Sequence, residues 1–185
     1  ISAIGKGFEM AFEMGLVDRT PRLVCAQAQQ ANPLYQSFRN GFRLFSPQQA
    51  KPTQASAIRI GNPVSVHRAI RVLQQFDGVV EQASEEELAQ AAIQADRAGF
   101  YCCPQTGVAL ATANKLAARG VIEKQETVVV ISTAHGLKFS DFKQMCHDQK
   151  AVAPNSPANR TVTLPAKVDA VLTAIERFVK TRHGA

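Results

Sequence analysis

The sequence predicts an α/β domain with an open, mostly parallel sheet and helices on both faces. The first observation is alternation, since short apolar runs typical of strands take turns with longer segments of helical periodicity. The second is the position of three glycines, since Gly15, Gly99 and Gly120 each follow a helix-like segment and are expected to end it. Strands that alternate with helices indicate a parallel sheet, in which each strand reaches its neighbour through a crossover helix.

The N-terminal third is expected to contribute one helix, one strand and a long irregular stretch. Residues 1–16 place Ile4 and Phe8 on one helical face. Residues 22–26 form a short apolar run that is typical of a buried strand. Residues 27–56 are rich in Gln, Asn, Pro and Ser and show no period, and irregular stretches this long are commonly functional.

The middle of the chain carries clearer signals. Ser65 is placed to cap a helix over residues 66–76, and residues 78–81 follow as a strand. Ser84 and Glu87 have the spacing of a capping box, in which each side chain bonds the other residue's backbone N–H. This box is expected to open a helix that runs to about residue 98.

The last elements are an alanine-rich helix, the most apolar strand and a final amphipathic helix. The helix is expected over residues 106–119, after a turn that contains Pro104. Three consecutive valines make residues 127–132 the strongest strand candidate. Residues 166–180 show the apolar spacing of one helix face.

The charge, the length of the apolar runs and the cysteine spacing limit the kinds of partner and site that are expected. The net charge is +6, but Lys and Arg are scattered rather than gathered on one face, so no nucleic-acid partner is expected. No apolar run approaches the roughly 20 residues that cross a bilayer, so no membrane association is expected. The four cysteines form no C-x-x-C pair, which favours a reducing compartment and no structural metal.

The chemistry is expected where the strand over 127–132 ends in Thr133, Ala134, His135 and Gly136. Ligands of open α/β sheets bind beyond the carboxyl ends of strands. The turn over residues 103–106 is a second such place. The alternative is that the Thr133 hydroxyl and the His135 ring make only local hydrogen bonds. The chain contains no G-x-S-x-G, P-loop or G-x-G-x-x-G motif.

Six stretches of the chain carry a resemblance to a known family, in the family's order, from near residue 1 to about residue 143: GLVDRTPRLVCAQA, ANPL, ASAIRIGNPVSVHRA, GVVEQASEEEL, GFYCCPQTGVAL and VVVISTAHGLKF. The sequence resembles the C-terminal part of threonine synthases, which are pyridoxal-phosphate enzymes of the tryptophan-synthase-like fold, also called fold type II. That fold is a three-layer open sheet covered by helices.

The resemblance implies roles for residues at the two ends of the cofactor. The threonine of the family's T-x-H-G-L-K motif, here Thr133, hydrogen-bonds the pyridine nitrogen. The family's phosphate loop directly precedes the first helix, so Ile1 and Ser2 would be either the last residues of that loop or part of the first helical turn. The family's Schiff-base lysine lies upstream, so the resemblance implies no catalytic lysine in this chain.

The resemblance also implies pocket walls and a division of the chain. Besides the residues that follow Thr133, the wall positions come from two segments: Ala55, Ser56, Ala57, Cys103, Pro104 and Thr106. Residues 1–150 would be the C-terminal portion of the large cofactor-binding domain, without the N-terminal half of the enzyme. Residues 151–185 would add a C-terminal loop and helix.

The function implied is conversion of O-phospho-L-homoserine and water to L-threonine and phosphate with pyridoxal 5'-phosphate. The implied partners are the N-terminal half of the same protein and a second copy in a homodimer. The implied compartment is the cytoplasm, or the plastid stroma in a plant. The isolated chain is expected to be inactive. Two alternatives stay open: another lyase of the same fold, such as a threonine dehydratase or cysteine synthase, and a truncated non-catalytic copy.

Overall fold

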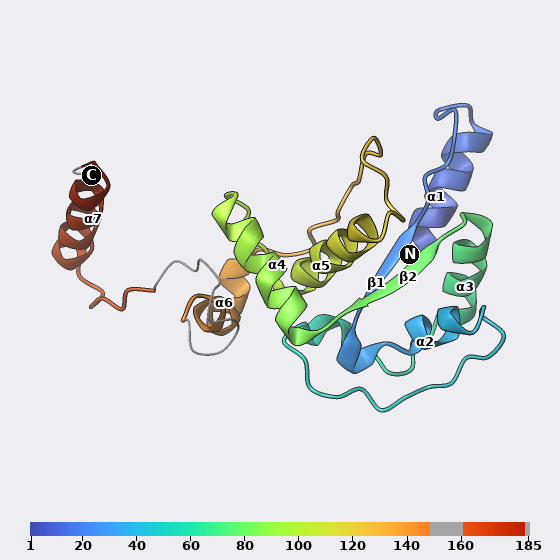
Figure 1. Ribbon diagram of the computed structural model, residues 1–185, viewed down its shortest axis with the longest axis horizontal. Helices are drawn as coiled ribbons and strands as arrows, with labels where there is room; N and C mark the ends of the chain where they lie inside the picture. The colour runs from blue at the N-terminus through green and yellow to red at the C-terminus, as the bar shows by residue number, and fades with distance from the viewer. Residues whose placement is uncertain (149–160, 184–185) are drawn as a thin grey trace.

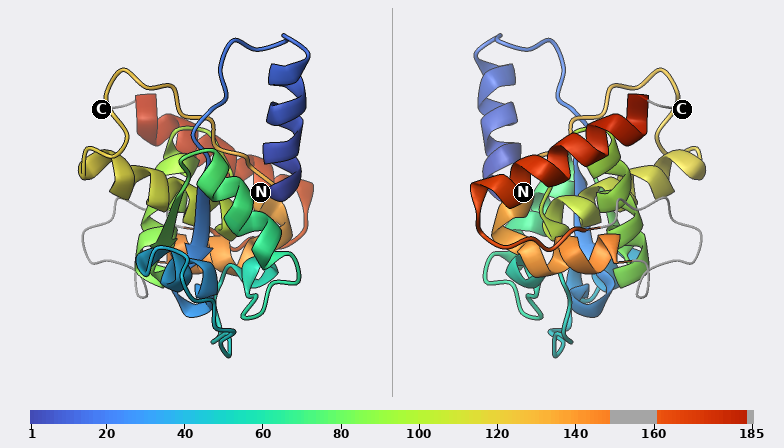
Figure 2. Two further views of the ribbon diagram at one scale, coloured as in Figure 1. Left: turned by 90° about the vertical axis from the view of Figure 1, so that its right-hand side faces the viewer. Right: turned by 90° about the vertical axis from the view of Figure 1, so that its left-hand side faces the viewer.

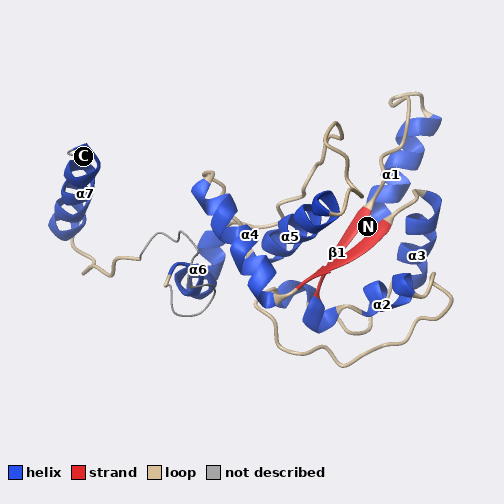
Figure 3. Cartoon of the chain, in the orientation of Figure 1, coloured by secondary structure: helices blue, strands red, loops and turns tan. Residues whose placement is uncertain are grey.

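A two-stranded parallel sheet lies at the centre of the computed structural model, which describes residues 1–148 and 161–183. Strand β1 (Val24–Ala28) pairs with β2 (Val79–Ala83) in register, from Val24 opposite Val79 to Ala28 opposite Ala83. Figure 3 shows both strands between groups of helices. The pairing confirms a parallel α/β arrangement.

Helices account for most of the remaining structure. The α-helices are α1 (Ser2–Glu13), α2 (Pro33–Arg39), α3 (Val66–Gln75), α4 (Glu85–Arg97), α5 (Pro104–Ala118), α6 (Ser140–His147) and α7 (Val168–His183). Three short 3-10 turns are η1 (Gln29–Ala31), η2 (Ser56–Ile58) and η3 (Gly136–Phe139). None of the helices in the described residues is both long enough and apolar enough to span a bilayer.

The sheet separates two hydrophobic clusters, which makes three layers. Ala28 and Ala83 pack with α4, α5 and α6 on one face. Val80 packs with Leu34 and Leu73, from α2 and α3, on the other. Successive side chains of a strand point to opposite faces, so β2 serves both clusters. Figure 1 shows α4 and α5 on one side of the strands and α1 to α3 on the other.

Two helices lie at the margins of this body. Helix α1 and the loop that leads to β1 rise beyond the sheet (Figure 2) and leave Met10, Phe12 and Met14 largely exposed. Helix α7 lies apart from the sheet (Figure 1), and its apolar residues are exposed too, Phe178 by 62%. Both helices therefore present apolar surface to their surroundings.

Close approach of α4 and α5 depends on Gly107. A Cβ at this position would lie 2.6 Å from the Leu88 carbonyl oxygen. The N-terminus of α5 is thereby pressed against the buried face of α4, which includes Ala92 and Ile93. This packing fixes the turn over residues 103–106 that the sequence analysis selected.

Most of the predicted elements are confirmed within a few residues. Both predicted features of the α4 N-terminus are present, since Ser84 Oγ accepts from the Glu87 amide at 3.1 Å and Glu87 Oε2 accepts from the Ser84 amide at 2.7 Å. Ser65 is the N-cap residue of α3, but its side chain makes no capping bond. The predicted domain boundary between residues 150 and 151 lies outside the described residues.

Three predictions of the sequence analysis were wrong in detail. The stretch 27–56 is not irregular throughout, because Pro33 sets the backbone angle for the first turn of α2 and Leu34 is buried. Helix α5 begins at Pro104 rather than Thr106, for the same reason. Residues 127–132 pair with no strand within the described part of the chain. Val129 is 84% exposed.

Candidate active site

Two short segments meet next to the N-terminus of α5. The Gly136 amide donates to the Tyr101 carbonyl at 2.8 Å, and Cys102 forms an isolated antiparallel bridge with His135. A Cβ on Gly136 would lie 2.7 Å from Lys143 Cε and 2.7 Å from Tyr101 Cδ1. Glycine is required here by the close approach of these side chains. The contacts hold residues 132–136 against residues 99–103.

A cluster of one thiol and three hydroxyls occupies the junction. Cys103 is the N-cap residue of α5, and its Sγ accepts from the Thr106 amide at 3.4 Å. Sγ lies 3.1 Å from Thr106 Oγ1 and 3.8 Å from Thr133 Oγ1. Thr106 Oγ1 lies 3.3 Å from Ser132 Oγ. The helix start is therefore linked through side chains to both residues at the end of the extended segment.

These donors change the acidity of Cys103. Burial raises the pKa of the thiol, but hydrogen bonds from the Thr106 side chain and amide, Thr133 and the Ala134 amide outweigh it, so the pKa is lowered. Burial alone dominates elsewhere and raises the pKa of Cys25 to about 11 and that of Cys146 to about 12. Cys103 is thus set apart from these cysteines by its hydrogen-bond donors.

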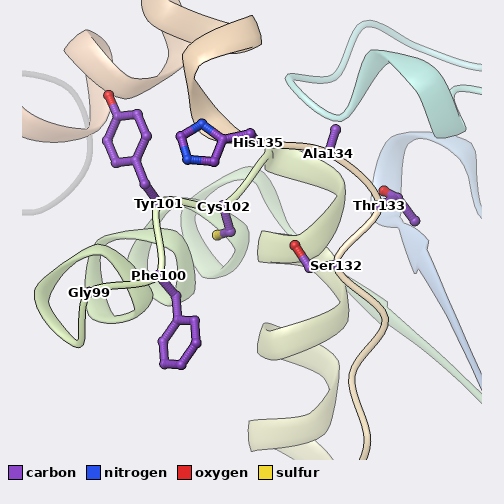
Figure 4. Close-up of a pocket in the computed structure, with 8 residues that line it drawn as sticks. All are labelled: Gly99, Phe100, Tyr101, Cys102, Ser132, Thr133, Ala134 and His135. Atoms are coloured by element: carbon purple, nitrogen blue, oxygen red, sulfur yellow. The ribbon is translucent and has the colours of Figure 1, made fainter.

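A shallow cavity of about 440 Å³ lies along the same segment. It is lined by residues 99–102 and 132–135 (Figure 4). The Tyr101 and His135 rings share one side of it, with centroids 5.7 Å apart. In Figure 4 the Thr133 side chain points away from these rings. The cavity lining also includes Ser132 and Thr133, which contact Thr106 and Cys103, so the cavity and the hydroxyl cluster adjoin each other.

The structure gives one described hydrogen-bond contact for each of the two polar residues of the motif. His135 Nδ1 accepts from the Leu137 amide at 3.2 Å, which is the local bond that a structural role predicts. The Thr133 hydroxyl makes its described contact with Cys103 Sγ rather than with nearby backbone. The Thr133 residue is exposed, so its hydroxyl is accessible to a further group.

The other predicted positions divide between two places. Ala55 is fully buried in the core cluster that includes Cys102 and Val108, and η2, which begins at Ser56, contacts α5. Ser56 and Ala57 are exposed. Pro104 and Thr106 are buried at the α5 N-terminus, and Ala134 is half-buried.

Ile1 and Ser2 do not join this group. Ile1 packs against the second core cluster, across the sheet, and Ser2 is the first residue of α1. Neither residue makes a described hydrogen bond to the α5 N-terminus. The structure therefore brings together the predicted residues from 55–57, 103–106 and 133–136, and leaves the predicted phosphate end separate.

Sequence reasoning missed two members of this neighbourhood. Ser132 was not named as a candidate, and in a regular strand its side chain would point away from that of Thr133. The segment is unpaired, and both hydroxyls reach the same cluster. Lys143 was also missed, although its spacing of four from His147 places both on one face of α6 and could have signalled a shared partner.

Comparison with known proteins places these features in a family. Residues 1–134 match the family described as "Pyridoxal-phosphate dependent enzyme". The chain is 48% identical over 183 residues to "Threonine synthase 2, chloroplastic" of Arabidopsis thaliana, covering 97% of the chain and 35% of that protein. It is 31% identical to a threonine synthase of Methanocaldococcus jannaschii, covering 97% of the chain and 41% of that protein.

A solved structure supports the fold. The crystal structure of threonine synthase from Escherichia coli matches with a TM-score of 0.56 at 16% identity, covering 86% of this chain and 38% of that one. At this identity the match concerns the fold alone. The chain spans between 35% and 41% of the length of these three proteins.

Proposed function

The chain belongs to the family of pyridoxal-phosphate-dependent enzymes, and from this premise we propose that it is the C-terminal part of a threonine synthase. The reaction would convert O-phospho-L-homoserine and water to L-threonine and phosphate. The observation that carries the proposal is the match to the plant enzyme, 48% identical over 97% of the chain. The exposed Thr133 hydroxyl beside the α5 N-terminus supports it.

The residues present fit the cofactor's pyridine end. A hydroxyl donates a hydrogen bond to an unprotonated ring nitrogen, whereas a carboxylate would hold that nitrogen protonated. The groups around Thr133 Oγ1 are a thiol and hydroxyls, from Cys103, Thr106 and Ser132, with no carboxylate among their described contacts. Ala134, the next residue after Thr133, carries only a methyl side chain. The donor set therefore suits a flat, neutral ring.

Other positions would complete the pocket. Cys103, Pro104 and Thr106 would form one wall, and Ala55, Ser56 and Ala57 the other. Ala134, His135 and Gly136 would border the ring. Ile1 and Ser2 would lie at the phosphate, where backbone N–H groups of the first turn of α1 are free to bind an anion. When bound, the cofactor supplies an electron sink for carbanion chemistry.

The direction of the Thr133 hydroxyl depends on Cys103. While Cys103 is a thiol, its S–H can donate to Thr133 Oγ1 and leave the hydroxyl proton for the ring nitrogen. If Cys103 were a thiolate, the Thr133 hydroxyl would instead donate its hydrogen bond to Cys103 Sγ. The Thr106 and Ala134 amides both donate toward Sγ and stabilise the anion. Cys103 thus influences how well Thr133 can hold the ring.

We assign the Schiff-base lysine to the part of the protein that precedes this chain. Two partly or fully buried lysines are engaged elsewhere: Lys115 Nζ lies 3.0 Å from Glu87, and Lys143 Nζ lies 2.5 Å from Asp96. No catalytic residue is assigned within the chain. The isolated 185 residues are expected to show no turnover of phosphohomoserine, and measurable turnover by them would refute this assignment.

The same proposal names the partners and the compartment. The N-terminal part of the protein would cover the exposed residues of segment 127–132 and of α1, including Val129 and Phe12. A homodimer is proposed from the resemblance to threonine synthases. The compartment would be the cytoplasm, or the plastid stroma in a plant, as for the relative named chloroplastic.

The proposal is tested with the full-length protein loaded with pyridoxal phosphate. Phosphohomoserine, threonine and O-acetylserine are supplied in parallel, and release of phosphate, ammonia or acetate is measured. Turnover of phosphohomoserine to threonine supports a threonine synthase. Preference for either other substrate would assign a different lyase of the same fold. No turnover of any of them would favour a non-catalytic copy.

A further inference from the structure

Lys143 is buried, charged and unused by the proposed chemistry. It is 1% exposed, and its Nζ lies 2.5 Å from Asp96 Oδ1. His147 Nε2 lies 2.9 Å from the other oxygen of the same carboxylate. The pair joins α6 to α4. Burying a charged group costs desolvation free energy even when the group is paired. A hydrophobic contact would hold two helices together equally well without that cost. The cluster therefore calls for a role besides packing.

The Lys143 side chain touches the motif glycine. Its Cε lies 2.7 Å from where a Cβ of Gly136 would stand. Its Nζ lies 4.7 Å from the centre of the Tyr101 ring, in reach of a cation–π contact. The Tyr101 carbonyl in turn accepts the hydrogen bond from the Gly136 amide. Lys143, Tyr101 and Gly136 therefore pack as one unit, with Asp96 fixing the ammonium.

Gly136 follows Thr133 by three residues, so the packing of Gly136 against Lys143 and Tyr101 affects where the Thr133 side chain lies. The segment that carries Thr133 pairs with no strand in the described residues, so no sheet ladder holds it. Its described restraints are the contacts of Ser132 and Thr133 with Thr106 and Cys103 at one end. At the other end they are the backbone contacts with Tyr101 and Cys102 and the packing of Gly136 on Lys143 and Tyr101. A short exposed segment that is restrained at both ends adopts few conformations, whereas a segment restrained at one end adopts many.

We propose that Lys143 is a positioning residue, which holds Gly136 through the Asp96 ion pair and the Tyr101 ring and so fixes the Thr133 hydroxyl at the cofactor's ring nitrogen. This inference rests on the proposed role of Thr133. Lys143 touches neither cofactor nor substrate in this account and acts through Gly136. Its removal would weaken the hydrogen bond that Thr133 makes.

The test compares four variants of the full-length holoprotein: Lys143→Met, Lys143→Arg, Thr133→Val and the double variant Lys143→Met/Thr133→Val. Methionine keeps most of the stem that packs on Gly136 and removes the charge. The readouts are the dissociation constant for pyridoxal phosphate and the absorption maximum of the bound cofactor. Lys115→Met is the matched control, because Lys115 also pairs with carboxylates, Glu87 and Glu81, but lies far along α5.

The expected result is that Lys143→Met and Thr133→Val each raise the dissociation constant by about 3- to 10-fold, the range of one hydrogen bond, and shift the absorption maximum alike. The double variant should bind no more weakly than Thr133→Val alone, because both changes remove the same bond. Lys143→Arg should recover part of the affinity. Lys115→Met should leave both readouts unchanged.

Two outcomes would overturn the proposal in distinguishable ways. If the effects of Lys143→Met and Thr133→Val multiply in the double variant, Lys143 acts independently of Thr133 and only the positioning role fails. If Thr133→Val changes neither readout, the assigned role of Thr133 fails as well. If Lys143→Met does not fold because Asp96 keeps only its contact with His147, Asp96→Asn/Lys143→Met removes both members of the ion pair and is compared in the same cycle.

Discussion

Replacing Gly136 with alanine should destabilise the chain through steric overlap. The new Cβ would lie 2.7 Å from Lys143 Cε, 2.7 Å from Tyr101 Cδ1 and 3.0 Å from the Cys102 carbonyl oxygen. Carbon atoms in contact stand about 3.5–4.0 Å apart, so two side chains must move by roughly 1 Å. Lys143 cannot retreat freely, because Asp96 holds its ammonium. Overpacking of this kind costs about 1–3 kcal/mol.

Thermal unfolding of the 185-residue chain, followed by near-ultraviolet circular dichroism, measures this cost. A loss of about 2 kcal/mol lowers the Tm by roughly 4–8 °C for a chain of this size. Gly7→Ala is the matched control, because nothing lies within 4 Å of its added Cβ and α1 should gain about 0.5–1 kcal/mol. Equal Tm values for Gly136→Ala and the parent would refute the argument that crowding requires glycine.

Three further predictions concern single side chains. Ser84→Ala should cost about 1 kcal/mol in urea denaturation, whereas Ser65→Ala, which loses no capping bond, should be nearly neutral. Burial raises the pKa of Glu87, but hydrogen bonds from the Ser84 amide and Lys115 outweigh it and lower the pKa. Its stabilisation is therefore present above the unfolded-chain pKa and lost as pH falls through the folded one, so Glu87→Gln should flatten the acid limb of the stability curve. Cys103→Ser should abolish the lowest-pH step in a titration of thiolate ultraviolet absorbance, whereas Cys25→Ser should leave that step in place.

Elements whose signals are local were predictable from the sequence. The capping box at Ser84 needs only its own four residues, and the structure forms both of its bonds. Gly15 and Gly99 follow α1 and α4 with φ of 69° and 89°, angles that glycine adopts without strain. Helix α2 was missed because residues 27–56 show no helical period and are rich in Gln, Asn, Pro and Ser. Pro33 nevertheless stands at the first helical position, which proline favours.

The candidate site was predictable only in part, because its contacts join residues far apart in the chain. Thr133 and the turn at Cys103 were each predicted from their positions after the ends of strands. In the structure, Cys103 Sγ lies 3.8 Å from Thr133 Oγ1. Sequence reasoning could not foresee that Lys143 would pack on Gly136, since that contact depends on how α6 folds back. Nor could it foresee that Ser132 and Thr133 would reach the same cluster.

The apolar sequence of residues 127–132 fits a buried environment that the described residues do not provide. An apolar run without alternation is typical of a strand buried on both faces in the interior of a parallel sheet. Here Val128 is 48% exposed, Val129 84% and Ile131 58%. A strand's backbone groups must be paired when it is buried, and β1 and β2 pair only with each other among the described residues. The chain spans 35% of the length of its plant relative, and the proposed function therefore expects the neighbours of this run in the remainder of a threonine synthase. On that proposal, the Thr133 site would reach its working geometry when that remainder completes the sheet.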